Sequence, residues 1–244
     1  MRPTVAVVDD ASLIRESIGL LMPGLDVVAA TANVEELVRR GPAVDVVLLD
    51  LHLANLEQQP DVRQGIAAVR ALTRRGYRVC VYSQEERRFV LAACLAAGAS
   101  GIVSKALPCD RAERLFHEVA TGGTVVPQPV VGILEVLVRR DCITLLSERQ
   151  RQILHGRARG LSYAQVAKRL FVSESTLRGY WYDLTRSLSD SLSGLTPGEI
   201  ERALGLAPGD LLEFWEDRPA DRTAGGPAGG PADRTAWWRI GRPR

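Results

Sequence analysis

The sequence has few of the residues that build disulfide frameworks or zinc sites. Its 244 residues include four cysteines, which lie far apart without a Cys-x-x-Cys pair, and three histidines, which do not cluster. Zinc sites and disulfide networks need such residues at short, regular spacings. The cysteines are therefore expected to be reduced, buried thiols.

Long apolar runs are also missing. The longest extends from Phe89 to Ala99, far short of the roughly 20 residues that a membrane-spanning helix needs. The chain begins Met-Arg-Pro-Thr and shows no signal-peptide pattern at its start. We therefore expect no membrane partner and a cytoplasmic location.

Charge is balanced overall but unevenly distributed. Residues 1–126 carry 14 basic and 15 acidic side chains, whereas residues 139–188 carry ten basic and four acidic ones. Residues 189–218 reverse the sign, with two basic and seven acidic side chains. A basic block of domain size favours a polyanionic partner for that block alone, although an ordinary solvated surface has a similar composition.

The first half alternates short β-branched runs with helical patterns, which is typical of a parallel sheet covered by helices. An α/β doubly wound domain with a five-stranded parallel sheet is therefore expected over residues 1–126. The expected strands are Thr4–Val8, Val27–Ala30, Val44–Leu49, Val79–Tyr82 and Gly101–Ser104. The expected helices lie near 12–22, 34–40, 65–75, 86–97 and 110–120.

The second half has no strand pattern. A linker over residues 127–144 contains a helix near 130–140 that could act as a stiff connector, and a small all-α domain with a helical extension is expected over 145–218. Residues 219–244 are rich in Gly, Pro and Ala and are expected to be disordered. The helices of the all-α domain are expected near 147–158, 162–169, 174–187, 197–204 and 209–217.

Polar side chains close several strands of the first domain. Asp9 and Asp10 end the first strand, Asp50 the third, Ser83 the fourth and Lys105 the fifth. The carboxyl ends of parallel strands meet at one edge, where ligands bind. Three carboxylates there favour Mg²⁺ as a cofactor held by Asp9, Asp10 and Asp50. One carboxylate could then accept a phosphoryl group, with Lys105 and the Ser83 hydroxyl contacting its oxygens.

These positions, in order and near-normal spacing, resemble the receiver domain of two-component response regulators. The matching segments are Val-Val-Asp9-Asp10, Leu-Leu-Asp50-Leu-His-Leu, Tyr-Ser83 and Gly-Ile-Val-Ser-Lys105. The resemblance implies that Asp50 accepts phosphate from a sensor histidine kinase and that Asp9 and Asp10 help to bind Mg²⁺. Lys105 is one of only two lysines beside 29 arginines, and a compact ammonium suits a phosphoryl contact.

The chain departs from the receiver pattern at three places. The loop after Asp50 reaches Gly65 at about twice the usual distance, so that Asn55–Gln64 form an insertion. Gln84 stands where a small residue usually follows the hydroxyl. Ile102 occupies the position of the aromatic residue that, with the hydroxyl of Ser83, forms the family's switch. The coupling of the pocket to the output surface is thereby in question.

The second domain resembles the LuxR-type helix-turn-helix of NarL/FixJ-type regulators. The resemblance is carried by Leu146-Ser-Glu-Arg-Gln-Arg-Gln-Ile-Leu154, Gly160-Leu-Ser-Tyr-Ala-Gln-Val-Ala167 and Leu170-Phe-Val-Ser-Glu-Ser-Thr-Leu-Arg178. It implies that the helix after Ser173 enters the major groove, with Leu177 and Arg178 facing base edges. For Trp181 we prefer packing against neighbouring helices. The expected DNA-binding residues are Lys168, Ser173, Thr176, Leu177, Arg178, Tyr182 and Arg186.

The favoured interpretation is a non-enzymatic, DNA-binding transcription regulator controlled by phosphorylation. Its expected partners are double-stranded DNA, a sensor histidine kinase and a second copy of the chain on DNA, with RNA polymerase as a further candidate. The alternative within regulation is a phosphate-independent receiver that responds to a partner or small molecule. A phosphatase of the haloacid-dehalogenase type would need a second acid at the position of His52, and an adaptor without DNA affinity does not account for the basic block.

Overall fold

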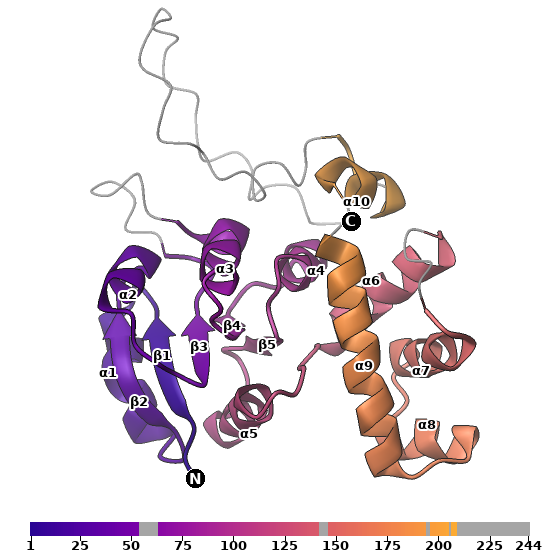
Figure 1. The fold of residues 1–244 in the computed structure, drawn as a ribbon, viewed down its shortest axis with the longest axis horizontal. Coiled ribbons are helices and arrows are strands. Elements are labelled where there is room, and N and C mark those ends of the chain that lie inside the picture. Colours follow the sequence, from indigo (N-terminus) through magenta and orange to yellow (C-terminus); the bar gives the residue numbers. More distant parts are fainter. Residues whose placement is uncertain (54–62, 142–145, 194–195, 205, 209–244) are drawn as a thin grey trace, which may run out of the picture.

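A computed structural model of the chain describes residues 1–53, 63–141, 146–193, 196–204 and 206–208. These residues form an α/β domain that is followed by a set of helices (Figure 1). The expected helix 209–217, the tail 219–244 and most of the expected insertion lie outside the described residues.

The α/β domain is built on five parallel strands in the order β2-β1-β3-β4-β5. The prediction of a parallel five-stranded sheet is thereby confirmed. The chain runs from β1 to β2 on one side and then crosses to β3 on the other, so strand order reverses between β1 and β3. Such a reversal leaves a crevice at the carboxyl ends of these two strands. The strands are β1 (Thr4–Val8), β2 (Asp26–Thr31), β3 (Val46–Leu49), β4 (Val79–Ser83) and β5 (Gly101–Ser104).

Helices cover both faces of the sheet (Figure 1). Ile18 and Phe116, from the first and fifth helices, belong to an apolar cluster with Val5 and Val7 on one face. The second, third and fourth helices pack on the other face in a separate cluster. The five helices are α1 (Ser12–Leu21), α2 (Val34–Arg40), α3 (Gly65–Thr73), α4 (Arg88–Ala96) and α5 (Cys109–Ala120).

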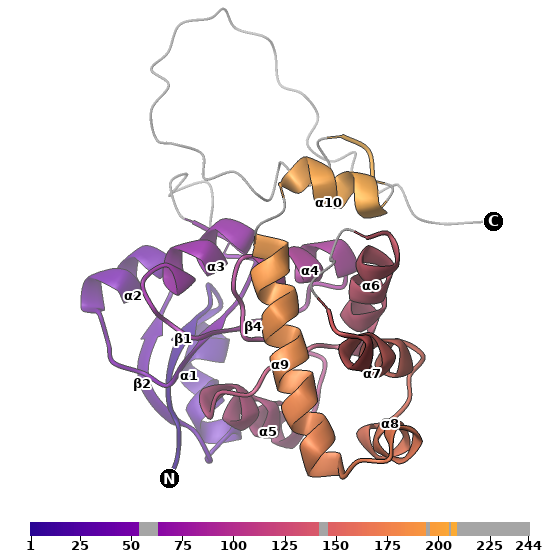
Figure 2. The same ribbon diagram turned by 45° about the vertical axis from the view of Figure 1, so that its right-hand side comes forward.

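The remaining helices pack against the sheet domain as well as against each other. The second cluster continues from α4 into them, so the two halves of the chain share an apolar core. Figure 2 shows α6 and α9 beside α4. Among the described helices, none is long and apolar enough to cross a membrane. The helices are α6 (Gln128–Arg139), α7 (Glu148–Ala158), α8 (Tyr163–Leu170), α9 (Glu174–Ser193) and α10 (Pro197–Leu204).

Helix α6, expected as a stiff connector, packs against other helices along its length. Val130, Leu134 and Leu137 are buried at helical spacing, and α6 contacts α4, α7 and α10. A helix that is apolar at positions i, i+4 and i+7 buries that face against neighbours. The geometry of α6 therefore fixes how the second half sits on the first.

Candidate functional site

The carboxyl ends of β1 and β3 bring three carboxylates together. Asp9 directly follows β1, and Asp50 follows β3 with its backbone N–H donating to Val8 O at 2.9 Å. One carboxylate oxygen from each of Asp9, Asp10 and Asp50 lies within 4.8 Å of the others. Asp9 and Asp50 are buried, with 1% and 7% of their surface exposed. The strand-end prediction for these three acids therefore agrees with their observed positions.

Lys105 bridges two of the acids. Its Nζ donates to Asp9 Oδ2 at 2.7 Å and to Asp50 Oδ2 at 2.6 Å. Burial raises the pKa of Asp9, and the nearby ammonium only partly offsets this effect. Burial alone would lower the pKa of Lys105, but its hydrogen bonds to Asp50 and Asp9 outweigh it and raise that pKa. Lys105 is thus held protonated as the counter-charge of this pocket.

Ser83 and Ile102, the two residues expected to form the switch, are both buried. Ser83 ends β4 and is 2% exposed, and its Oγ accepts a hydrogen bond from the Glu85 N–H at 3.3 Å. Ile102, on β5, is 4% exposed and belongs to the apolar cluster that includes α4. A side chain that is already inside the core has no inward rotation left to make. Of these two residues, only Ser83 therefore carries a polar group that can respond at this pocket.

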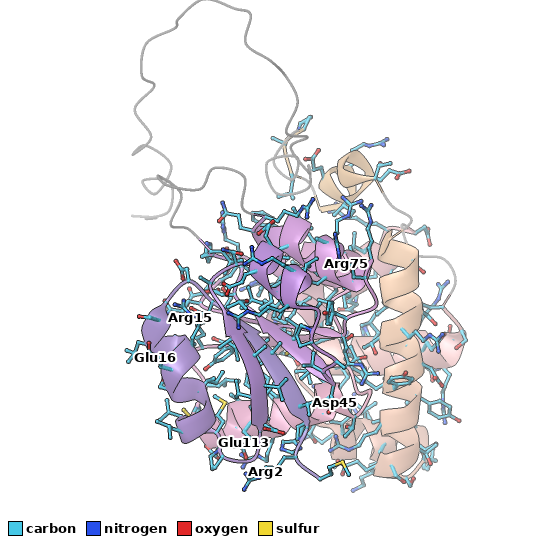
Figure 3. The ribbon with its side chains drawn as sticks, turned by 60° about the vertical axis from the view of Figure 1, so that its left-hand side comes forward. Arg2, Arg15, Glu16, Asp45, Arg75 and Glu113 are labelled. Carbon is cyan, nitrogen blue, oxygen red and sulfur yellow. The ribbon has the colours of Figure 1, made fainter. Side chains whose placement is uncertain are left out.

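Two charged residues near the pocket were not singled out from the sequence. Arg15, on α1, donates from Nη1 to the main-chain oxygens of Asp9 and Asp10, both at 2.7 Å. Figure 3 labels Arg15 toward the end of α1 that faces this pocket. Arg15 holds the backbone of the acidic pair, so it positions carboxylates without touching them. Because its acceptors are main-chain oxygens, the sequence carries no signal that marks Arg15 for this role.

Glu85 is the second of these residues. Its side chain is only 5% exposed and pairs with Arg87, whose Nη2 and Nε donate at 2.6 and 2.9 Å. His52 Nε2 lies 3.3 Å from Glu85 Oε2. Burial alone would raise the pKa of Glu85, but the bonds from Arg87 outweigh burial and lower it. Glu85 thus links the segment after β3 to the segment after β4.

The second predicted site is the helix pair α8 and α9. Ser162 accepts the Gln165 N–H at 3.2 Å and Gln165 reciprocates, which forms a capping box that starts α8. Phe171 ends α8 with a φ of +54° and is fully exposed. Ser173 Oγ accepts the Thr176 N–H at 3.0 Å at the start of α9. The two helices therefore form a turn-linked pair with local capping.

The expected DNA-binding residues divide into exposed and buried ones. Leu177 has no exposed surface and packs in the core, so the prediction that it faces base edges is wrong. Trp181 is 4% exposed and contacts the Tyr163 ring edge-on, which confirms the preferred packing role. The other expected DNA-binding residues are all exposed: Lys168, Ser173, Thr176, Arg178, Tyr182 and Arg186.

Arg178 is exposed but not free. Its Nη2 donates to Glu174 Oε1 at 2.8 Å, and its guanidinium lies 4.6 Å from the centre of the Tyr163 ring. An exposed i,i+4 ion pair of this kind contributes little stability. Arg178 can therefore exchange Glu174 for another acceptor at low cost.

The carboxyl-terminal half of α9 faces the sheet domain. It packs against α4, and Tyr182 and Arg186 line a cavity whose opposite wall belongs to the sheet domain. Two of the expected DNA-binding side chains thus lie beside the first domain in this arrangement, while Arg178 lies one to two turns further toward the start of α9.

Known proteins of this organisation match both halves of the chain. A family model described as a response regulator receiver domain matches residues 5–118, and one described as bacterial regulatory proteins of the luxR family matches residues 144–189. The DNA-binding transcriptional activator DevR/DosR of Mycobacterium tuberculosis is 29% identical over 189 residues, which cover 72% of this chain and 83% of that protein. The nitrate/nitrite response regulator protein NarL of Escherichia coli is 24% identical, with coverages of 72% and 84%.

A third relative extends the match slightly. The transcriptional regulatory protein UhpA of Salmonella typhimurium is 28% identical over 193 residues, which cover 77% of this chain and 92% of that protein. The two family models account for separate parts of the chain, and the acidic pocket and the helix pair fall inside them. This chain belongs to the response regulators, DNA-binding transcription regulators that join a receiver domain to a LuxR-type DNA-binding domain.

Proposed function

We propose that this regulator binds DNA under the control of phosphorylation at Asp50. The observation that carries the proposal is the bridge from Lys105 to both Asp9 and Asp50, at 2.7 and 2.6 Å. When a phosphoryl group is attached to Asp50, the ammonium of Lys105 can move to pair with the added negative charge. In this proposal a carboxylate oxygen of Asp50 forms the new bond to phosphorus. The bond between phosphorus and the histidine nitrogen of the donor kinase breaks at the same time.

The acidic pocket suits Mg²⁺ as a cofactor. Its three carboxylates offer oxygen ligands within 4.8 Å of one another, and Mg²⁺ prefers such hard donors. Asp9, Asp10 and Asp50 would hold the ion, which supplies positive charge that neutralises the incoming phosphoryl oxygens. Arg15 keeps the backbone of Asp9 and Asp10 in place through two 2.7 Å bonds.

Lys105 and Ser83 would contact the phosphoryl group. Lys105 Nζ already donates to Asp50 Oδ2, so it needs only a small shift to donate to a phosphoryl oxygen instead. Ser83 Oγ now accepts the Glu85 N–H, which leaves its own hydroxyl proton free to donate. This contact is the one through which phosphorylation would reach the segment after β4.

The phosphoryl donor in this proposal is a sensor histidine kinase. Helix α1 begins two residues after Asp10 and exposes Leu13 and Leu20, which are 74% and 83% exposed. A donor protein that reaches Asp50 must cover the mouth of the pocket, and an adjacent apolar helix face gives it a surface to bury. Leu13 and Leu20 share one face of α1 because they are seven residues apart.

Labelling of Asp50 tests the proposal. Intact-mass measurement after treatment with acetyl phosphate and Mg²⁺ should reveal one added phosphoryl group, because Asp50 follows β3 and lies beside Lys105 and the acidic pair. Asp50→Asn should remain unlabelled, and chelation of Mg²⁺ should prevent labelling of the wild type. Asp110→Asn, which changes an exposed aspartate on α5, is the matched control and should label normally. An unlabelled wild type would favour the phosphate-independent alternative, which the buried Ile102 also supports.

DNA is the second partner in this proposal. Helix α9 would enter the major groove as a recognition helix, with Arg178 toward the bases and Lys168, Ser173 and Thr176 near the backbone. Helix-turn-helix regulators commonly bind as dimers on paired half-sites, and we extend the proposal to a second copy of this chain on DNA. Tyr182 and Arg186 would join the contact only after α9 separates from the receiver.

Arg178→Ala should weaken binding to a specific duplex by about 1–3 kcal/mol and relax preference at one base pair, because a guanidinium can grip guanine with two hydrogen bonds. If Arg178 touches only phosphate, affinity should fall equally on specific and scrambled duplexes, and the salt slope should shrink by about one unit. Titrations on both duplexes at several salt concentrations distinguish these outcomes. Arg111→Ala, an exposed arginine of α5, should leave both curves unchanged, and identical behaviour of Arg178→Ala would remove Arg178 from the DNA contact.

A further inference from the structure

A cavity of about 230 Å³ lies between the receiver and the DNA-binding domain. One wall comes from the receiver: from Arg78 before β4, from Leu95 of α4, from the turn before β5 and from the turn after α5. The other wall comes from α6 and α9. Because Arg78 stands at the start of β4, the cavity is at the opposite end of the sheet from the acidic pocket. Figure 3 labels Asp45 at that end and Arg15 toward the other. The phosphorylation chemistry does not use this cavity.

The cavity is positively charged. Its 14 lining residues include Arg78 and Arg186 and no acidic residue. Arg78 uses Nη1 to donate to Val119 O and Ala120 O, at 3.1 and 2.6 Å. Arg186 is exposed and makes no hydrogen bond or ion pair with any residue in the described part of the chain. Two guanidinium groups that line one cavity attract an anion into it.

Asp45, a carboxylate near Arg78, is already engaged elsewhere. The pKa of Asp45 is lowered chiefly by its hydrogen bonds from Thr4 and more weakly by Arg78. Asp45 accepts both the Thr4 N–H and the Thr4 hydroxyl at 2.8 Å, and it does not line the cavity. Among the described residues, no carboxylate therefore lines the cavity itself.

The remaining lining combines hydroxyl groups with an apolar floor. Ser100 and Thr124 from the receiver and Tyr182 from α9 bring hydroxyls that make no hydrogen bond with the described residues. Apolar side chains complete the lining, from α4, the α5–α6 connection, α6 and α9: Leu95, Val126, Leu134 and Leu188. Guanidinium forks and hydroxyl donors suit the oxygens of a phosphate group, and the apolar floor suits a small organic body attached to it.

We propose that this cavity binds a small phosphate monoester that bridges the receiver and α9. The anion would contact Arg78 of the receiver and Arg186 of α9 at the same time. It would therefore bind more tightly when α9 is packed on the receiver than when the two are separated, and it would shift the population toward the packed state. A consequence, which rests on the proposed DNA function, is that the ligand competes with DNA because it occupies Tyr182 and Arg186. The regulator would then respond to a small anion independently of Asp50.

Calorimetry with phenyl phosphate tests the site without DNA. Full-length protein is titrated in EDTA, so that the acidic pocket holds no Mg²⁺ to attract the anion. We expect one-to-one binding with a dissociation constant of about 1 mM or tighter. Arg186→Gln should weaken it roughly tenfold, since one charge-assisted hydrogen-bond donor is lost. Arg169→Gln, which changes an exposed arginine of α8 outside the cavity, should bind like the wild type.

Three results would overturn the proposal: no saturable binding, equal affinity of wild type and Arg186→Gln, or inorganic phosphate binding as tightly as phenyl phosphate. The last would mean that the apolar floor takes no part. Competition is measured separately, as the fall in DNA affinity when phenyl phosphate replaces chloride at equal ionic strength. Failure of the protein to bind DNA at all would refute the proposed function while leaving the calorimetric result intact.

Discussion

Lys105→Met should lower the free energy of unfolding by about 3–5 kcal/mol at pH 7 in magnesium-free buffer, the cost of removing one partner from a buried ion pair. Lys105 Nζ is 2.7 Å from Asp9 and 2.6 Å from Asp50, and the side chains of these acids are 2% and 9% exposed. Methionine fills similar volume but supplies no charge, so two buried carboxylates would lose the ammonium that donates a hydrogen bond to each of them. Urea unfolding in EDTA measures the loss.

The stability loss of Lys105→Met should depend on pH, whereas the loss caused by a simple packing defect should not. Burial already raises the pKa of Asp9, and loss of the ammonium should raise it further. A carboxyl whose folded pKa lies above its unfolded value binds more protons in the folded state, so its contribution to stability falls as pH rises through that window. The deficit of Lys105→Met should therefore be smaller at pH 5 than at pH 7.

Lys168→Met is the matched control, because Lys168 is the only other lysine in the chain and is exposed on α8. Its effect should stay within about 0.5 kcal/mol. Addition of Mg²⁺ should recover part of the stability of Lys105→Met, since an ion that binds only the folded state stabilises it by mass action. Equal, pH-independent losses in both lysine variants would contradict the counter-charge role of Lys105.

Leu177→Ala should lower the free energy of unfolding by about 2–5 kcal/mol, the range for truncating a buried leucine. Leu177 has no exposed surface and belongs to the core cluster that runs from the receiver into α9. If Leu177 were exposed and contacted base edges, its truncation would instead cost little stability and would alter the base preference on DNA. Thermal or urea unfolding of the full chain distinguishes these cases.

Leu13→Ala makes the same chemical change at a leucine that is 74% exposed on α1, and its effect should stay within about 0.5 kcal/mol. The sequence preference of folded Leu177→Ala on DNA should match that of the wild type. Altered base preference without loss of stability would restore Leu177 to the DNA-reading set.

The sheet could be predicted because its strands carry a strong local pattern. The predicted bounds of β1 and β5 agree with the structure, and β3 begins two residues later than predicted. Helix ends were less predictable: α9 was expected to end at 187 and extends to Ser193. The sequence places its next glycine at position 194, so nothing in this stretch strongly opposes the helix.

The buried face of α9 could have been read from its periodicity. Leu177, Trp181, Leu184 and Leu188 recur at spacings of four, three and four residues, which indicates a core-facing stripe. The family resemblance assigned Leu177 to the groove because it gives a position along the helix but not the direction of the side chain. The same period in α6 indicated burial of Val130, Leu134 and Leu137.

The acidic pocket was more predictable than its supports. Asp9, Asp50 and Lys105 each end a strand, and parallel topology brings such ends together. Arg15 binds main-chain oxygens, and backbone acceptors exist at every residue, so no pattern marks its partner. Glu85 meets Arg87 within its own loop, but it meets His52 only through the approach of a second loop, which is a tertiary event.

The most direct test of phosphorylation-controlled DNA binding is a titration of full-length protein on a duplex selected from a random-sequence pool. Wild type and Asp50→Asn are compared with and without acetyl phosphate and Mg²⁺. Phosphorylation should raise the affinity of the wild type roughly 5- to 150-fold, the usual range of coupling between two sites, because α9 must leave α4 for Tyr182 and Arg186 to reach DNA. Asp50→Asn should not respond. Equal affinities of labelled and unlabelled wild type would contradict the account.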